Sequence, residues 1–231
     1  MKVFSISDLH LSGLTDKPME VFGAGWENHF EKIKKDWREK VSDEDVVLIC
    51  GDVSWGTVLE EGLYDLRTLK ELKGKKVFIR GNHDYWWNGI TKLRAAARDG
   101  TFYFLQNDCV KIESIIICGS RGWTCPGSSD YGEHDEKLYL REAERFKLCY
   151  RQVEKVRAEE DKLIVMTHYP PFSLKSPDTL FTRMFEEWRA DKVVFGHIHG
   201  ETYFPLRTVK NAIEYVLTSC DEVGFSLQRI L

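Results

Sequence analysis

Histidine, aspartate and asparagine side chains recur in five short clusters of this 231-residue chain. The residues in these clusters are Asp8, His10, Asp52, Asn82, His83, His168, His197 and His199. Carboxylate, imidazole and amide oxygen donors together suit divalent ions such as Mn²⁺, Fe²⁺, Co²⁺ and Zn²⁺. Even when His83 is left out, the other residues of the clusters are too many ligands for one tetrahedral ion. The set suits two ions that share a bridging carboxylate, an arrangement common in displacement at phosphorus.

Each cluster directly follows a run of apolar residues that favour β-structure. The runs are Val3–Ile6, Val46–Ile49, Val77–Ile79, Leu163–Met166 and Val193–Phe195. In an open sheet the carboxyl ends of the strands face one crevice, where ligands bind. We therefore predict that five strands deliver these polar side chains to one site.

The segments between and after these runs predict the other elements. Apolar residues at helical spacing predict helices over about residues 26–40, 63–72, 90–97, 137–160 and 181–188. Further strands are predicted at Phe102–Leu105 and Val110–Cys118, where antiparallel pairing is plausible, and in a C-terminal meander of Glu201–Phe204, Ile213–Leu217 and Gly224–Leu227. Residues 12–25 predict an irregular loop, either a lid or a surface excursion. Without a linker or repeat, we expect one domain over residues 1–231.

Composition and charge restrict the class of protein. The apolar content of 42% and the charged content of 30% are ordinary for a soluble protein. The net charge of -4 argues against a dominant nucleic-acid or membrane surface. No apolar run approaches the roughly 18 residues of a membrane span. Because the chain is predicted to enter a strand at Lys2, we expect no secretory signal. The six cysteines lack a C-x-x-C pair, so we expect free thiols in a reducing cytoplasm.

The five clusters resemble, in order, the five motifs of the calcineurin-like metallophosphoesterases. The matching segments are Asp8-x-His10, Gly51-Asp52, Gly81-Asn82-His83-Asp84, His168 and Gly196-His197-x-His199. Any one motif is common by chance, but all five in order after strands are specific. The resemblance implies an α+β fold, a four-layer α/β/β/α sandwich of two facing mixed sheets flanked by helices.

The resemblance also implies a role for each matching residue. Asp8, His10 and His199 would hold one metal ion, Asn82, His168 and His197 the other, and Asp52 would bridge them. The metal ligands implied are thus Asp8, His10, Asp52, Asn82, His168, His197 and His199. His83 would protonate the leaving alkoxide or stabilise transition-state charge, and Asp84 would hydrogen-bond His83 and fix its tautomer. His83 and Asp84 are therefore the implied catalytic pair.

The resulting hypothesis is a cytoplasmic phosphoesterase with two divalent ions (Mn, Fe, Zn or Co). It would hydrolyse a phosphomonoester or phosphodiester by in-line attack of a metal-bound hydroxide. A small-molecule phosphoester or a nucleotide fits the chain size and the aromatic residues best. A nuclease is a further alternative, although the acidic charge balance provides no basic track for a polynucleotide. The alternatives are a catalytically silent binding module on the same fold and a mononuclear hydrolase of amides or esters. The sequence does not determine the metal, the substrate or the oligomeric state.

Several residues near the motifs have two interpretations. Asp8 or Asp52 alone could cap a helix, and His168 alone could be a core histidine. The aromatic residues beside the motifs could stack on a base or aryl group, although packing is the more common role; they are Trp55, Tyr85, Trp86, Trp87, Trp123 and Tyr131. Arg121 is either a phosphate clamp or a surface arginine. His29 and His134 match no motif and are predicted on a helix surface and in a solvated loop.

Overall fold

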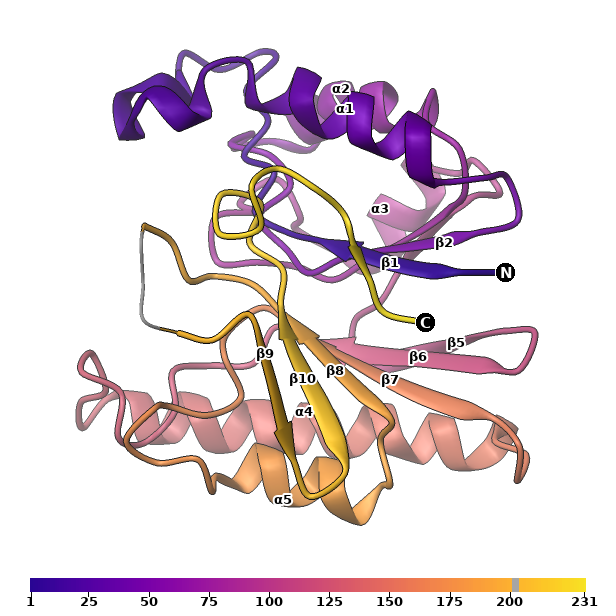
Figure 1. Cartoon of the computed structure of the whole chain (residues 1–231), viewed down its shortest axis with the longest axis vertical. Helices are drawn as coiled ribbons and strands as arrows, with labels where there is room; N and C mark the ends of the chain where they lie inside the picture. The colour runs from indigo at the N-terminus through magenta and orange to yellow at the C-terminus, as the bar shows by residue number, and fades with distance from the viewer. Residues whose placement is uncertain (201–203) are drawn as a thin grey trace.

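Two sheets lie face to face at the centre of the molecule, and helices cover the outer face of each (Figure 1). The computed structural model describes residues 1–200 and 204–231. The four layers confirm the predicted α/β/β/α sandwich, and both sheets are mixed.

The first sheet has the strand order β11-β1-β2-β3-β4. Strands β1 to β4 run parallel, and the short β11 pairs antiparallel with β1 at the edge. The bounds are β1 Val3–Ile6, β2 Val46–Ile49, β3 Lys75–Phe78, β4 Phe102–Phe104 and β11 Gln228–Arg229. The strands that precede the first three motif clusters are therefore neighbours in one sheet.

The second sheet has the strand order β5-β6-β7-β8-β10-β9. Its four central strands are parallel, and antiparallel β5 and β9 form the edges. The bounds are β5 Asp108–Ile112, β6 Ile115–Ser120, β7 Lys162–Thr167, β8 Lys192–Phe195, β9 Arg207–Lys210 and β10 Ile213–Leu217. Strands β7 and β8, which precede the last two clusters, lie side by side.

Apolar residues on both faces of the central strands explain why two sheets pack together. In β2, Val46 and Leu48 point to the core between the sheets, whereas Val47 and Ile49 point to the helices. This alternation is the two-residue period of a strand, and all four side chains are fully buried. A strand that is apolar on both faces must be covered on both faces. The second sheet therefore covers the face that the helices leave open.

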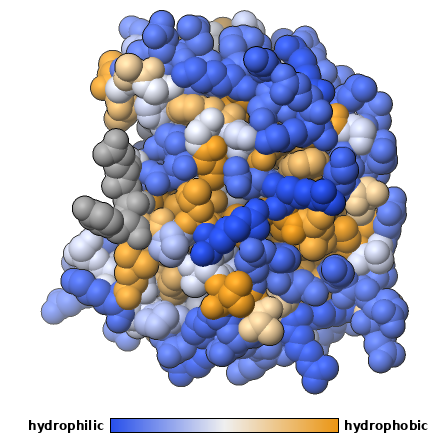
Figure 2. Space-filling model, viewed as in Figure 1, coloured by the Kyte–Doolittle hydropathy of each residue, from blue (hydrophilic) through white to orange (hydrophobic). Residues whose placement is uncertain are grey.

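The helices form the two outer layers. Helices α1 (His29–Lys40), α2 (Leu59–Lys70) and α3 (Ile90–Ala96) pack on the first sheet, and α4 (Asp135–Val156) and α5 (Leu180–Glu187) pack on the second. Figure 2 shows polar side chains over both helix layers and apolar side chains in the band between them. Among the described residues, no helix is long and apolar enough to cross a membrane.

Two predictions about the middle of the chain were wrong. Phe102–Leu105 does not pair with Val110–Cys118, because β4 pairs parallel with β3 in the first sheet. The run Val110–Cys118 is not one strand either. It belongs to an antiparallel β5–β6 hairpin that turns at Glu113, whose φ is 53°. Local β-propensity does not indicate which sheet a strand joins, so the sequence left this choice open.

The C-terminal meander was predicted only in part. Ile213–Leu217 is strand β10, but it pairs parallel with β8 as well as antiparallel with β9. Gly224–Leu227 is not a strand, and the C-terminal strand β11 that pairs antiparallel with β1 spans Gln228–Arg229. Of the predicted strand Glu201–Phe204, residues 201–203 lie outside the described residues.

Residues 12–25 contain more structure than an irregular loop. They include the 3-10 helix η1 (Met19–Phe22) and most of a second, η2 (Ala24–Trp26), so the predicted helix from residue 26 begins only at His29. Met19 and Trp26 are buried in the core beneath the first helix layer, whereas Val21 and Phe22 are exposed. The segment is therefore anchored at both ends of its helical part.

Candidate metal centre

Four of the predicted ligands lie on loops with unusual backbone geometry at the strand ends. Asp8, His10, Asp52 and His197 have positive φ angles of 58°, 46°, 51° and 71°. A non-glycine residue rarely adopts this left-handed conformation, and such strain clusters at functional sites. The tight turns aim these side chains across the ends of the sheets instead of along the strands.

The loops after β2 and β3 are in direct backbone contact. A Cβ at Gly51 would lie 2.7 Å from the Cα of Gly81, and a Cβ at Gly81 would overlap Asp52 Oδ1. Gly51 also has a φ of 95°, which favours glycine. This close approach brings Asp52 and Asn82 to the same point.

Asp84 holds these two loops together. Its carboxylate accepts hydrogen bonds from the backbone N–H groups of Asp52 (2.9 Å), Val53 (2.9 Å) and Gly81 (2.7 Å) and a longer one from Ser54 (3.3 Å). The indole of Trp86 donates a fifth, at 2.9 Å. A fully buried carboxylate needs such donors because it has lost its hydration.

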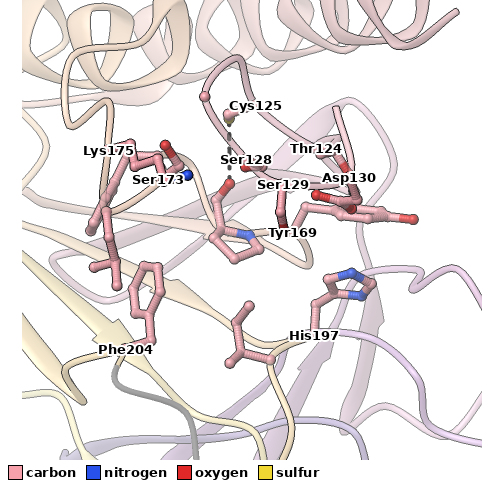
Figure 3. A pocket seen from close by; sticks show the side chains of 15 residues that line it. Thr124, Cys125, Ser128, Ser129, Asp130, Tyr169, Ser173, Lys175, His197 and Phe204 are labelled. Atoms are coloured by element: carbon pink, nitrogen blue, oxygen red, sulfur yellow. Dashed lines mark hydrogen bonds between the residues drawn. The ribbon is translucent and has the colours of Figure 1, made fainter. Parts of the chain in front are cut away.

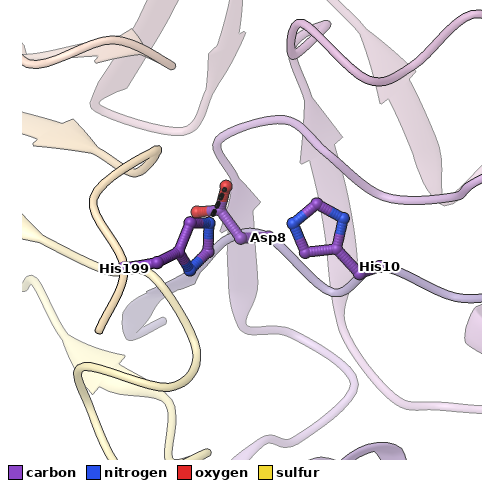
Figure 4. A group of neighbouring side chains, drawn as sticks. All are labelled: Asp8, His10 and His199. Carbon is purple, nitrogen blue, oxygen red and sulfur yellow. Dashed lines mark ion pairs between the residues drawn. The ribbon is translucent and has the colours of Figure 1, made fainter. Parts of the chain in front are cut away.

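Asp8, His10 and His199 form the first ligand group (Figure 4). Asp8 lies between the two imidazoles, and its Oδ1 is 3.4 Å from His199 Nε2. His10 stacks on Trp55 with ring centroids 4.7 Å apart, and its Nδ1 is buried with no hydrogen-bond partner among the described residues. His199 Nδ1 lies 2.8 Å from Asp221 Oδ1, a carboxylate that orients the ring.

Asn82, His168 and His197 form the second group. Asn82 Oδ1 is 2.6 Å from His168 Nε2 and 3.0 Å from His197 Nδ1, so the three donor atoms converge. His168 Nδ1 lies 2.9 Å from the carbonyl oxygen of Cys50, which can only accept a hydrogen bond. This bond keeps the proton on Nδ1 and leaves the lone pair of Nε2 directed at the centre.

Asp52 lies between the two groups. Its Oδ2 is 3.5 Å from His168 Nε2 in the second group and 4.0 Å from His10 Nε2 in the first. Its Oδ1 accepts the backbone N–H of His83 at 2.8 Å. Asp52 is therefore placed where a carboxylate could bridge two ions.

The electrostatics of the site favour a bound cation. Asp8, Asp52 and Asp84 are buried, and within residues 1–200 and 204–231 no lysine or arginine forms an ion pair with them. Burial, followed by the charges of Asp84 and Asp8, raises the pKa of Asp52 well above its usual range. Burying carboxylates this close together is costly unless a positive charge compensates them. Divalent ions would supply that charge, so the residues fit a metal centre.

Three of the four predicted histidine ligands are in the neutral state that a metal ligand needs. Burial lowers the pKa of His10 to about 3 and that of His168 to about 4, so both rings are neutral at pH 7. Burial and the neighbouring His168 lower the pKa of His197 to about 3. His199 differs, because its hydrogen bonds to Asp221 and Asp8 outweigh burial and raise its pKa to about 10. Metal binding at His199 would therefore displace a proton.

A cavity of about 280 Å³ opens over the site. Asp52, His83 and His199 are among its polar lining residues, and its apolar and aromatic lining residues are Met19, Phe22, Trp26 and Trp55. The ring centroid of His83 lies 4.7 Å from that of Trp55 and 5.9 Å from that of His10. The His83 ring is thus beside His10 of the first ligand group, and burial lowers the pKa of His83.

A second cavity, also of about 280 Å³, shares His197 with the first. Figure 3 shows His197 and Tyr169 at one end of this cavity and Ser173 and Lys175 at the other. Ser128, Ser129 and Thr124 add hydroxyl groups to its wall. The candidate site is therefore bordered by an apolar cavity and a hydroxyl-rich one.

Comparison with known proteins agrees with this geometry. The sequence profile of the calcineurin-like phosphoesterases matches residues 1–201. The chain belongs to this family. No curated protein matches it significantly in sequence.

Solved structures with the same fold resemble this calcineurin-like phosphoesterase along nearly its whole length. A phosphopantetheinyl hydrolase from Mycobacterium tuberculosis is 13% identical with a TM-score of 0.56, covering 100% of this chain and 95% of that chain. A protein from Thermus thermophilus is 11% identical with a TM-score of 0.60, covering 99% and 97%. A protein of unknown function from Aquifex aeolicus is 14% identical with a TM-score of 0.52, covering 99% and 95%. At these identities the likeness shows the fold alone.

The structure differs from the sequence predictions at Asp84. The expected hydrogen bond to the His83 ring is not among those in the described part of the chain, since Asp84 is surrounded by the donors named above. Asp84 acts on His83 through its charge, which opposes the lowering of the His83 pKa by burial. Asp84 therefore positions the candidate-site loops, and among the described residues its carboxylate is not hydrogen-bonded to the His83 ring.

The structure decides between packing and substrate stacking for Trp86 and Trp87. Trp86 and Trp87 are fully buried, and Trp86 packs against Gly62, so core packing is confirmed for both. Trp55 both packs against the core and lines the cavity. Trp123 contacts Tyr169 and donates a hydrogen bond to Asp135.

Two further residues contact the site or its loops and were not predicted to do so. Asp221 lies beyond the last motif, so sequence spacing gave no signal for it. His29 is half-buried, and its Nε2 lies 2.8 Å from the carbonyl oxygen of Leu9, between Asp8 and His10. The prediction of His29 on a helix surface was therefore wrong, whereas His134 is exposed as predicted.

All six cysteines are free thiols, as expected.

Proposed function

We propose that this protein hydrolyses a phosphomonoester or phosphodiester of a small molecule, using two divalent metal ions. The observation that carries the proposal is the position of Asp52 between two complete ligand groups. Asp8, His10 and His199 would hold one ion, and Asn82, His168 and His197 the other. Family membership supports a metal-dependent phosphoesterase in general.

The bound ions would polarise the phosphoryl oxygens and lower the pKa of water at the site. The protein itself provides a positioned proton donor. His83 faces the same cavity as Asp52, and its backbone is tied to Asp52 by a hydrogen bond of 2.8 Å. In its protonated form, the His83 imidazole would donate to the oxygen of the leaving group, which carries negative charge as the bond to phosphorus breaks.

The cavity supports a small organic leaving group. Trp55, Trp26 and Met19 line the same cavity as the polar residues of the site, and Met19 Sδ accepts a hydrogen bond from the Trp55 indole. A base or an aryl group would bury apolar surface there. A nuclease is a weaker candidate because the net charge is -4 and a polynucleotide needs an extended basic surface.

The test is hydrolysis of p-nitrophenyl phosphate and bis-(p-nitrophenyl) phosphate. Protein stripped with a chelator would be reloaded with Mn²⁺, and bound metal would be quantified in the same sample. We expect activity to return with about two metals per chain. We expect His83→Asn to keep both metals and to lower kcat by about 10²–10⁴-fold.

Each part of the proposal has an outcome that contradicts it. Protein that binds no metal would disprove the metal centre. Two bound metals without turnover of either ester would favour a silent binding module. Normal turnover by the His83 variant would show that the leaving group receives its proton elsewhere.

A further inference from the structure

Four arginine side chains surround a third cavity, of about 210 Å³, whose role the metal centre does not explain. The arginines are Arg80, Arg121, Arg141 and Arg145. They come from the end of β3, the end of β6 and two successive turns of α4. Elements that are far apart in the sequence thus converge to place guanidinium groups around one space.

The positive charge of this cavity is only partly compensated. The carboxylate of Glu142, fully buried, accepts a hydrogen bond from Arg145 Nη1 at 2.5 Å and another from Ser120 Oγ at 3.0 Å. Arg141 lies 3.9 Å from the same carboxylate. Glu142 itself does not line the cavity, and neither does any other carboxylate of the described residues. One carboxylate therefore pairs with two of the four arginines from outside the cavity lining.

Arg121 has hydrogen-bonding capacity that the protein leaves unused. Its Nε is buried and has no partner among the described residues, and its guanidinium lies over the Trp123 ring at 4.8 Å. Arg80 uses its Nε on the carbonyl oxygen of Asp84 at 3.2 Å, which leaves its terminal nitrogens free within the described structure. Buried donors normally find an acceptor. Planar, stacked guanidinium groups match the oxygens of a phosphate especially well.

The cavity lies beside the metal centre along the same edge of the two sheets. The second ligand group comes from the ends of β3, β7 and β8, and the arginine cavity uses the ends of β3, β4 and β6. Strand β4 is the neighbour of β3, and β6 is the neighbour of β7. At the contact between them, the carbonyl oxygen of Arg121 accepts the backbone N–H of His168 at 2.9 Å.

We propose that the cavity between Arg80, Arg121, Arg141 and Arg145 binds a second phosphate group of the substrate. This inference rests on the proposed function, because it assumes that the first phosphate is the one hydrolysed at the metal centre. The substrate class is then a small phosphoester with another phosphate on the same molecule. A substrate with one phosphate would leave the arginines uncompensated.

The experiment uses bisphosphonates as molecular rulers. Alkane bisphosphonates of increasing chain length, and monophosphonates of matching length, would compete with p-nitrophenyl phosphate for the metal-loaded enzyme. At the best length, we expect a bisphosphonate to bind at least about tenfold more tightly than its monophosphonate. Arg121→Gln and Arg141→Gln should each remove most of this advantage while leaving inhibition by the monophosphonate unchanged. Arg141 is half-exposed, so its variant is expected to fold. Arg151→Gln, an exposed arginine of α4 away from the cavity, is the matched control.

A second readout does not depend on activity. Pyrophosphate should raise the melting temperature of the chelator-treated full chain, and Arg121→Gln and Arg141→Gln should abolish this increase while Arg151→Gln keeps it. A bisphosphonate advantage that survives in both cavity variants would overturn the inference. So would a thermal shift without any bisphosphonate advantage, because the cavity would then bind free anions and not the substrate. Absence of p-nitrophenyl phosphate turnover with an intact thermal shift would contradict the proposed function instead.

Discussion

The role of Asp84 in holding the metal-site loops can be tested by Asp84→Asn. Asp84 Oδ2 accepts from the backbone N–H groups of Asp52 and Gly81, and Oδ1 accepts from Val53, Ser54 and the Trp86 indole. An asparagine must turn its NH₂ group toward one of these two sets. At least two donors then lose their acceptor and face another donor.

The expected loss of stability follows from these contacts. A hydrogen bond to a charged group contributes about 1.5–3 kcal/mol, and a buried donor left without a partner is costly. Removing a buried charge recovers part of the desolvation cost of Asp84, whose pKa burial raises. We therefore expect Asp84→Asn to lower the free energy of unfolding by about 3 kcal/mol. Urea denaturation with chelator present would measure it without a contribution from bound metal.

The matched control is Asp65→Asn. Asp65 is also buried, but it accepts from one backbone N–H, of Gly13 at 3.0 Å, and from the rotatable hydroxyl of Ser54 at 2.5 Å. The Ser54 hydroxyl can turn and accept from an asparagine, so the loss should be about 1 kcal/mol or less. If Asp84→Asn were no more destabilising than Asp65→Asn, the donors around Asp84 would have other acceptors and the reasoning would be wrong.

Two further predictions concern Asp221 and Lys76. Asp221→Ala removes the carboxylate 2.8 Å from His199 Nδ1, so a chelator-competition titration should show metal affinity weakened by about 10–100-fold; unchanged affinity would exclude an orienting role. Lys76 is fully buried, and burial lowers its pKa from 10.5 to about 8. The unfolded chain therefore binds more protons than the folded one between these values, and wild-type stability rises with pH across that window. By urea denaturation, the free energy of unfolding of Lys76→Met should exceed that of the wild type by about 1–2 kcal/mol at pH 7 and by less at pH 10. An equal increase at both pH values would refute the titration of Lys76.

The sequence determined the chemistry of the site because ligand type and strand-end position are local properties. Asp8, Asp52 and His168 each follow an apolar run, and such runs become buried strands whose ends meet at one edge. The order of the motifs then specified the family and, through it, the two facing sheets. Because the strands are apolar on both faces, the sequence alone required that other elements bury both faces of each sheet. It did not determine whether helices or a second sheet bury each face.

The tertiary structure decided which side chains meet across the sheets. Asp221 reaches His199, and Asp84 faces the donors of another loop instead of its neighbour His83, because loop packing and not sequence distance sets these contacts. Arg80 and Arg121 belong to different sheets and share a cavity only because β4 joined the first sheet and β6 the second. Such contacts depend on the pairing partners of each strand. Pairing is a long-range choice that the residues of one strand do not encode.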